Sequence, residues 1–183
     1  MLNELRKYFS ISDEQLAALE SHRILLERWN QRLNLTRVVG EEAVLRHYGE
    51  ALFLASLLPV GIVKVCDIGS GGGFPGIPLA IMRPDLSVTL VESHTRKAVF
   101  LREASHQRVL SERAELVKEQ FDCLVSRAVT PAEVAALTPR LAGQAWMLMA
   151  RSDADGSTWN IASELPWDPT SVVAFHVKHS VVS

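Results

Sequence analysis

A glycine-rich loop directly after a short apolar strand constrains the fold more than any other feature of the chain. The segment from Asp67 to Gly76 reads Asp-Ile-Gly-Ser-Gly-Gly-Gly-Phe-Pro-Gly, with five glycines in the last eight residues. Glycine loses more backbone entropy on folding than any other residue and contributes no side chain to packing. Such a run therefore indicates a tight turn at which the backbone approaches a ligand.

Strands and helices alternate after residue 61, which is typical of βαβ units. Strands are expected over 62–68, 87–91, 121–125 and 145–149 with a short piece at 108–110, and helices over 77–82, 96–107 and 131–140. Because helices of this length connect parallel strands, the pattern predicts an α/β fold with a doubly wound, mostly parallel sheet. The polar stretch 151–170 is expected to be a surface excursion, and 172–177 an edge strand.

The first 60 residues show a different spacing of apolar residues. Apolar residues recur at helical spacing over 13–33, where Ser12 supplies an N-cap, and a second helix is expected over 41–57. No strand interrupts them. We therefore divide the chain into an N-terminal helical extension, 1–60, and one compact ligand-binding unit, 61–183.

Composition excludes several classes of protein. The 183 residues carry a net charge of only −2, which argues against duplex DNA as an obligatory partner but leaves RNA open. No stretch of about 18 uninterrupted apolar residues exists, so no membrane span is expected. Two isolated cysteines without a disulfide framework favour a reducing, cytoplasmic location, and the six histidines show no metal-ligand spacing.

Two acidic residues at strand ends bear on the ligand. Asp67 closes the strand before the glycines and Glu92 closes the next one. A carboxylate at Asp67 would repel a pyrophosphate but attract a sulfonium or ammonium group, which favours S-adenosylmethionine. Glu92 is placed to accept the two ribose hydroxyls of an adenosine. The spacing Gly71-x-Gly73-x-x-Gly76 also fits a dinucleotide fingerprint, so the glycines alone do not identify the cofactor.

Two further strand ends carry candidate ligand contacts. Ala114 and Glu115 follow Arg113 where a third strand should meet its loop, the place at which such folds hold an adenine; a solvated charge pair explains the residues as well. Arg127 follows the fourth strand within Ser-Arg-Ala128, and it either faces the crevice or lies on the surface.

Several short motifs give the chain a family resemblance. The glycine loop continues as Phe-Pro-Gly-Ile-Pro-Leu79, and upstream stand Trp29-Asn30, Asn34-Leu35-Thr36 and Arg46-His47. Together with Glu92-Ser93, Arg113-Ala114-Glu115 and Ser126-Arg127-Ala128, over about residues 20–130, they resemble the bacterial ribosomal RNA small subunit methyltransferase G family, also called glucose-inhibited division protein B.

The resemblance implies a Rossmann-like class I methyltransferase that uses S-adenosylmethionine to methylate N7 of one guanine in 16S ribosomal RNA. It implies cofactor contacts at Gly69, Phe74, Ala114, Glu115 and Arg127. The fold argument adds Glu92, Asp67 and Gly71. The chain departs from the family at Glu50, where the family commonly has Asp, and at Arg151, which stands near the place of a family lysine.

Guanine N7 carries a lone pair and no proton, so its methylation needs positioning and no general base. We therefore expect no catalytic residue in the narrow sense and no metal. The candidate RNA contacts are Arg46, Arg96, Lys97 and Arg151. The expected partner is 16S ribosomal RNA or the 30S particle, bound by a monomer. Open alternatives are a methyltransferase of a small molecule or protein, a nucleotide-binding dehydrogenase, and a non-catalytic nucleotide-binding module.

Overall fold

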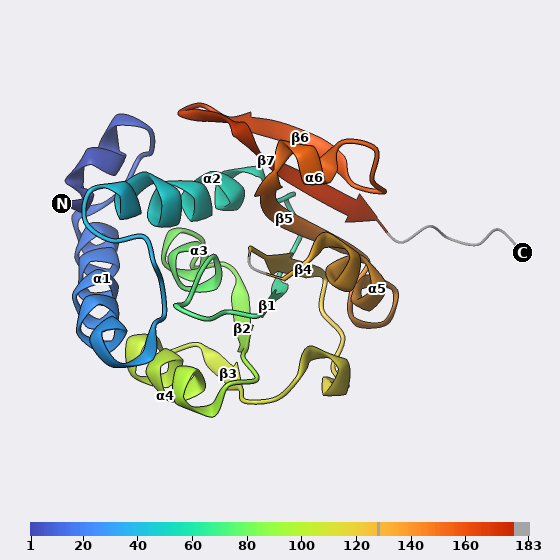
Figure 1. Cartoon of the computed structure of the whole chain (residues 1–183), viewed down its shortest axis with the longest axis horizontal. Helices are drawn as coiled ribbons and strands as arrows, with labels where there is room; N and C mark the ends of the chain where they lie inside the picture. The colour runs from blue at the N-terminus through green and yellow to red at the C-terminus, as the bar shows by residue number, and fades with distance from the viewer. Residues whose placement is uncertain (128, 178–183) are drawn as a thin grey trace, which may run out of the picture.

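The computed structural model describes residues 1–127 and 129–177. Ala128 of the predicted Ser-Arg-Ala motif and the last six residues of the predicted 61–183 unit, 178–183, lie outside this part. The described strands form one seven-stranded sheet in the order β3-β2-β1-β4-β5-β7-β6, with helices on both faces (Figure 1). This architecture confirms the predicted α/β fold with a doubly wound, mostly parallel sheet.

The elements follow the predicted alternation along the chain. The strands are β1 (Lys64–Ile68), β2 (Ser87–Val91), β3 (Arg108–Leu110), β4 (Cys123–Ser126), β5 (Gln144–Ala150), β6 (Asn160–Leu165) and β7 (Asp168–Val177). The α-helices are α1 (Asp13–Leu33), α2 (Glu50–Leu57), α3 (Gly76–Met82), α4 (Thr95–Ala104), α5 (Pro131–Leu141) and α6 (Arg151–Ala154). Two 3-10 helices, Leu2–Lys7 and Ala114–Leu116, and a π-helical segment, Val44–Gly49, complete the described helices.

The sheet brings the predicted site residues together along the carboxyl ends of its parallel strands. β1 pairs in parallel with β2 and β4, β2 with β3, and β4 with β5, whereas β7 pairs antiparallel with β5 and β6. Parallel strands end on the same side, so Gly69, Glu92, Arg127 and Arg151, each the first residue after its strand, all follow carboxyl ends at that edge.

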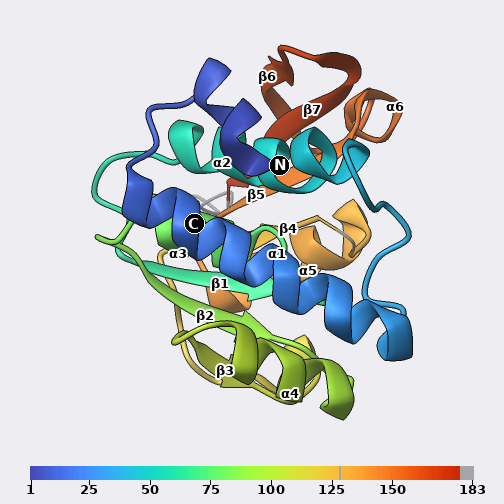
Figure 2. The same ribbon diagram turned by 90° about the vertical axis from the view of Figure 1, so that its left-hand side faces the viewer.

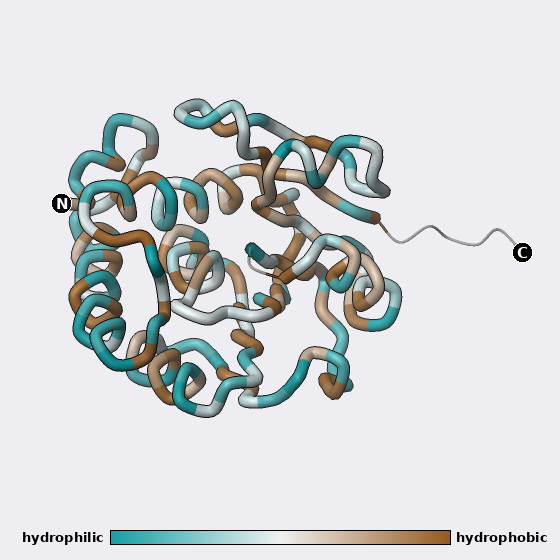
Figure 3. The backbone as a smooth tube through the Cα atoms, in the orientation of Figure 1, coloured by the Kyte–Doolittle hydropathy of each residue, from teal (hydrophilic) through white to brown (hydrophobic). Residues whose placement is uncertain are grey.

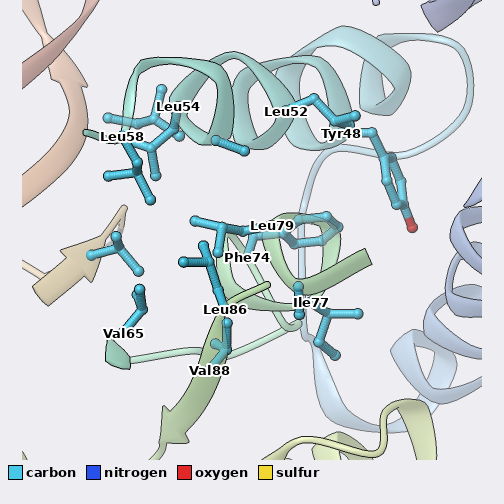
Figure 4. Close-up of a cluster of buried hydrophobic side chains, with 14 of the residues drawn as sticks. Tyr48, Leu52, Leu54, Leu58, Val65, Phe74, Ile77, Leu79, Leu86 and Val88 are labelled. Carbon is cyan, nitrogen blue, oxygen red and sulfur yellow. The ribbon is translucent and has the colours of Figure 1, made fainter. Parts of the chain in front are cut away.

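The two faces of the sheet bury two separate apolar cores. Along β5, Trp146 and Leu148 belong to one core, and Ala145, Met147 and Met149 to the other, as the period of two in a strand requires. The first core lies under α1 to α4 and the second under α5 (Figures 1 and 2). The close-up of the first core shows side chains of the N-terminal helices facing those of α3 and the sheet (Figure 4).

The N-terminal helices share this core with the sheet. α1 begins at Ser12, whose hydroxyl accepts from Gln15 N while the Gln15 side chain accepts from Ser12 N, which completes a capping box. Hydrophobic and hydrophilic segments alternate along α1, as its predicted periodicity requires (Figure 3). Leu19 of α1 and Leu52 of α2 are buried in one cluster with sheet residues. The boundary drawn at residue 60 stays a prediction.

Several predicted boundaries were wrong, among them the start of β4, which begins at Cys123 instead of 121. The second N-terminal helix begins as the π-helical segment Val44–Gly49 and continues as α2, where one regular helix was expected over 41–57. α4 ends at Ala104 instead of 107, because Ser105 adopts an extended conformation. β1 begins at Lys64 instead of 62. No helix in the described ranges is long and apolar enough to cross a membrane.

The predicted surface excursion over 151–170 was also wrong. It contains α6 and β6, with Trp159 and Leu165 buried. β7 is an inner strand between β5 and β6, so it is not the predicted edge strand. The polar residues misled the prediction because the sheet edge β6 buries one side chain, Leu165, and leaves most of the others open to solvent.

Replacing Leu165 tests this correction. Leu165 is 2% exposed in the first core, so Leu165→Ala should lower the free energy of unfolding by about 2–5 kcal/mol through lost burial and a cavity. Ile161→Ala is the control on the same strand, because Ile161 is 39% exposed; its cost should stay below about 1 kcal/mol. Urea denaturation of both variants measures the two free energies of unfolding. Equal, small decreases in both would support the original prediction that 151–170 is a surface excursion.

Candidate functional site

Asp67 lies beneath the glycine loop with no exposed surface. Its Oδ2 accepts from Gly76 N at 3.1 Å, which ties the end of the loop to β1, and its Oδ1 has no partner among the described residues. Burial raises the pKa of Asp67 to about 7, against an ordinary 3.8, and the bond from Gly76 N opposes the shift. The carboxyl group thus titrates near neutral pH and keeps one oxygen unused.

Glu92 holds the start of the same loop. Its Oε2 accepts from Gly71 N at 2.9 Å, and its Oε1 accepts from His94 N at 2.7 Å. The carboxylate is 8% exposed and bridges the loop after β1 and the turn after β2. Each carboxylate oxygen retains further acceptor capacity, so the predicted ribose contact remains chemically open to Glu92.

The loop presents bare backbone, and several of its glycines, Gly69 and Gly71 among them, cannot be replaced freely. Gly69 has a φ of 73°, and a Cβ there would lie 2.6 Å from Cγ2 of Val129. Gly71 has a φ of 52°, a left-handed conformation that side chains disfavour, and a Cβ there would make an ordinary contact, 3.8 Å from the carbonyl oxygen of Gly69. At Gly69 a glycine is needed because Val129 packs against the backbone where a side chain would begin.

A pocket of about 230 Å³ opens beside this loop at the carboxyl ends of β1 and β2. Gly69, Ala114 and Glu115 all line it, so the structure brings together three of the predicted cofactor contacts from two distant segments. Among the other lining residues, Ile68, Val91, Ser93 and Arg113 belong to predicted motifs and strand ends, and the sequence did not single out Glu112, Val129, Glu133 and Leu137. Glu133 and Leu137 come from α5, and only the tertiary fold shows that this helix reaches the pocket.

Phe74 is placed differently. Its ring is 7% exposed, stacks on His47 with centroids 4.7 Å apart and meets Tyr48 edge-on. It belongs to the first core and does not line the pocket beside Gly69. The ring thus fixes the glycine loop against the N-terminal helices, and the structure gives the predicted cofactor contact of Phe74 no support from its side chain.

Arg127 lines a second pocket, of about 200 Å³, beside β5. Its Nε lies 3.3 Å from Oε2 of Glu50, and its Nη1 donates to Nδ1 of His47. The pocket is lined by Arg46, Glu50, Arg127, Leu148, Met149, Ala150 and Ser171. Arg127 therefore lies apart from the pocket that holds Ala114 and Glu115, although Val129, two residues later, lines that first pocket.

A chain of hydrogen bonds connects Arg127 with α1. Because Nδ1 of His47 accepts from Arg127, Nε2 carries the proton and donates to Oγ1 of Thr36 at 2.6 Å. Asn30 holds Thr36 through two main-chain bonds of 2.9 Å. Burial, followed by the charge of Arg127, lowers the pKa of His47 to about 3, so the imidazole stays a neutral acceptor. The sequence analysis names His47 only as part of a motif and does not predict this contact.

The predicted RNA contacts fall into two groups. Arg96 is exposed and lines a groove of about 430 Å³ with Arg28, Trp29 and Arg32, and Lys97 follows it in α4. Arg46 and Arg151 instead pair with carboxylates, Arg46 with Asp168 at 3.8 Å and Arg151 with Glu164. Within the described ranges Arg96 and Lys97 make no ion pair, so their charges remain available.

Other chemistries find no support in the described part of the chain. No cluster of three or more metal-ligating side chains occurs there. Cys66 and Cys123 are buried in β1 and β4, and burial raises the pKa of both thiols. A thiol in this state is a poor nucleophile.

The fold is the Rossmann-like fold of class I methyltransferases. The magnesium protoporphyrin IX methyltransferase of Synechocystis, solved with bound S-adenosylmethionine, superposes with a TM-score of 0.56 at 15% identity, over 93% of this chain and 99% of that one. The profile of rRNA small subunit methyltransferase G matches residues 15–162. The chain belongs to the rRNA small subunit methyltransferase G family.

Curated relatives agree with this assignment. The ribosomal RNA small subunit methyltransferase G of a Roseiflexus species is 38% identical over 151 residues, covering 75% of this chain and 64% of that protein. The Neisseria gonorrhoeae protein of the same name is 42% identical over 113 residues, covering 57% and 54%. The chain spans 54–64% of the length of the curated relatives compared with it.

The raised pKa of Asp67 predicts a pH-dependent stability. The folded chain holds the proton more tightly than the unfolded one, so stability is greatest below about pH 4 for this group and is lost as the pH rises through about 7. Asp67→Asn carries no such charge. The free energy of unfolding of Asp67→Asn minus that of the original chain should therefore rise by roughly 1 kcal/mol per pH unit between pH 5 and 7. Above about pH 7 this difference should stay constant. Chemical denaturation at several pH values measures this; a constant difference would contradict it.

Proposed function

We propose that the pocket beside the glycine loop binds S-adenosylmethionine. The observation that carries this proposal is the charge of its walls: Glu112, Glu115 and Glu133 line it against a single cation, Arg113. Asp67 and Glu92 lie beneath the adjoining loop. A net negative pocket suits a ligand with a sulfonium and an ammonium group and disfavours a pyrophosphate, which weakens the dehydrogenase alternative.

The positions of the residues in and around this pocket support the following proposed roles. Gly69 and Gly71 let the ligand approach the backbone, and Glu92 orients the loop and accepts from the ribose hydroxyls. Ala114 and Glu115 are proposed to hold the adenine by main-chain and side-chain contacts. The bare Oδ1 of Asp67 would accept from the ligand's ammonium group through a bridging water.

We propose that the acceptor is N7 of a guanine in 16S ribosomal RNA, as the names of the relatives suggest for the RNA and as the family resemblance implies for the atom. When bound, S-adenosylmethionine supplies a methyl group on a sulfonium sulfur, which keeps the bonding electron pair when N7 takes the methyl carbon. No proton leaves N7. The chain therefore needs to orient the base and exclude water, and correct placement alone can contribute about 7–11 kcal/mol to lowering the barrier.

The cations of α4 are the proposed RNA contact. Arg96 and Lys97, with Arg28 and Arg32 across the groove, would neutralise phosphates, while Trp29 offers an aromatic edge. We propose that the chain acts in the cytoplasm as a monomer on 16S ribosomal RNA, free or within the 30S particle, without a DNA or membrane partner. A methyltransferase with a small-molecule or protein substrate is the second candidate, favoured only by the small volume of the pocket beside β5.

Methyl transfer to RNA tests the proposal. Purified protein with tritium-labelled S-adenosylmethionine should label 16S ribosomal RNA or 30S particles, and mass mapping should find 7-methylguanine at one position. Glu92→Gln should weaken cofactor binding about 10- to 100-fold in calorimetry. The carboxylate accepts two main-chain N–H bonds, one on each oxygen, and an amide has only one oxygen to accept them.

Asp122→Asn is the matched control. Asp122 also accepts two main-chain N–H bonds, from Val63 and Lys64, but at the amino end of β1, opposite the pocket. This variant should bind the cofactor normally. Equal losses in the two variants would assign both effects to stability, and label in a different macromolecule would overturn the RNA substrate.

A further inference from the structure

The middle of the glycine loop lies against α1. Gly72 is buried, and a Cβ there would lie 3.2 Å from Cδ1 of Leu26. Gly73 has a φ of 88°, and a Cβ there would lie 3.0 Å from Nε2 of His22. Because His22 and Leu26 are one helical turn apart, a single face of α1 packs against both glycines. The N-terminal helices therefore contact the loop itself as well as the core beneath it.

His22 makes two hydrogen bonds in the interior of the protein. The residue is 2% exposed, its Nε2 lies 3.0 Å from the carbonyl oxygen of Gly72, and its Nδ1 lies 2.8 Å from the hydroxyl of Tyr48. A carbonyl oxygen can only accept, so Nε2 carries the proton and donates to Gly72, and Nδ1 accepts from the Tyr48 hydroxyl. Burial lowers the pKa of His22 to about 4, so the ring is neutral near pH 7 and keeps this pattern.

Aromatic side chains enclose the ring of His22. Its centroid lies 5.2 Å from that of Phe74, 5.7 Å from that of Tyr48 and 6.1 Å from that of Phe100. Tyr48 and Phe74 also meet edge-on and belong to the first core (Figure 4). A ring packed in this way cannot turn without moving its neighbours. Packing and the Tyr48 hydroxyl thus fix the direction in which Nε2 donates.

The donor of His22 supplies what the carboxylates at the strand ends cannot. Glu92 and Asp67 hold the loop on either side of Gly72 by accepting from main-chain N–H groups. An ionised carboxylate has no proton to donate, so neither can hold a carbonyl group. A buried carbonyl oxygen needs a donor, and Gly72 receives one from α1.

We propose that His22 is a positioning residue, which holds the middle of the glycine loop in the conformation that binds S-adenosylmethionine. The inference rests on the proposed cofactor pocket beside Gly69. It adds to that pocket a residue of the N-terminal helices that does not line it. When the donor is removed, the loop spends less time in the binding conformation. The measured affinity then falls in proportion to the fraction of molecules that remain competent to bind.

Variants of His22 test the proposal through cofactor affinity. His22→Leu removes both ring nitrogens and should weaken binding of S-adenosylhomocysteine about tenfold in calorimetry, because the buried carbonyl of Gly72 loses its donor. His22→Gln brings an amide N–H close to the position of Nε2 and should restore the affinity to within about threefold of the original chain. Tyr48→Phe removes a single oxygen atom and should give an intermediate loss, because the bond from Nε2 remains.

Leu19→Val is the matched control on the same helix. Leu19 is fully buried on α1, one turn before His22, and its apolar side chain offers the loop no hydrogen bond. This variant should lower the free energy of unfolding in urea and leave the affinity for S-adenosylhomocysteine unchanged. Equal affinity losses in Leu19→Val and His22→Leu would show that a general loss of stability causes both, and would overturn the inference.

Hydrogen exchange gives a second readout that needs no ligand. Peptides that contain residues 69–76 should exchange faster in His22→Leu than in His22→Gln, because only the amide can hold the carbonyl of Gly72. Tyr48→Phe decides the question by its affinity if His22→Leu does not fold.

An unchanged affinity in His22→Leu would overturn the inference, as would an equal loss in His22→Gln or equal exchange in the two variants. Failure of the proposed function has another signature, since the original chain itself would then not bind S-adenosylhomocysteine. The exchange measurement tests the bond between His22 and the loop even in that case.

Discussion

The site depends on a backbone loop that has almost no side chains to hold it. Glycines let the chain come close to a ligand, but they leave it free to move, so the loop must be fixed from outside. Glu92 fixes its start through Gly71 N, and Asp67 fixes its end through Gly76 N. Both anchors are carboxylates at the ends of adjacent parallel strands, so the sheet itself determines where the loop lies.

Strand ends made much of this site predictable from the sequence. Asp67, Glu92 and Arg127 were singled out because they follow apolar strands, and parallel strands bring their carboxyl ends together. The same reasoning placed Ala114 and Glu115 beside Gly69, where the structure has them. These positions could be predicted because each inference needed only the strand ends. The path of the Arg127 side chain could not, and it turns to the pocket beside β5 instead.

The pocket beside β5 could not be predicted in this way. Glu50 belongs to a helix that begins with a π-helical segment, and a regular helix over the same residues would have turned its faces differently. Ser171 reaches the pocket only because β7 pairs antiparallel with β5, and the polar residues before it indicated no strand. Local patterns therefore predicted the residues around the glycine loop, whereas the pocket beside β5 depends on tertiary packing.

An aromatic cluster ties the two ends of the described chain together. Trp167, in the turn between β6 and β7, packs edge-on against Tyr8, Phe9 and Phe53, and so joins the N-terminal segment to the β6–β7 hairpin across α2. Through Ser171 the hairpin lines the pocket beside β5, and none of its residues lines the pocket beside the glycine loop. Substitutions in the hairpin would therefore change the walls of the pocket beside β5 and leave those of the pocket beside the glycine loop as they are.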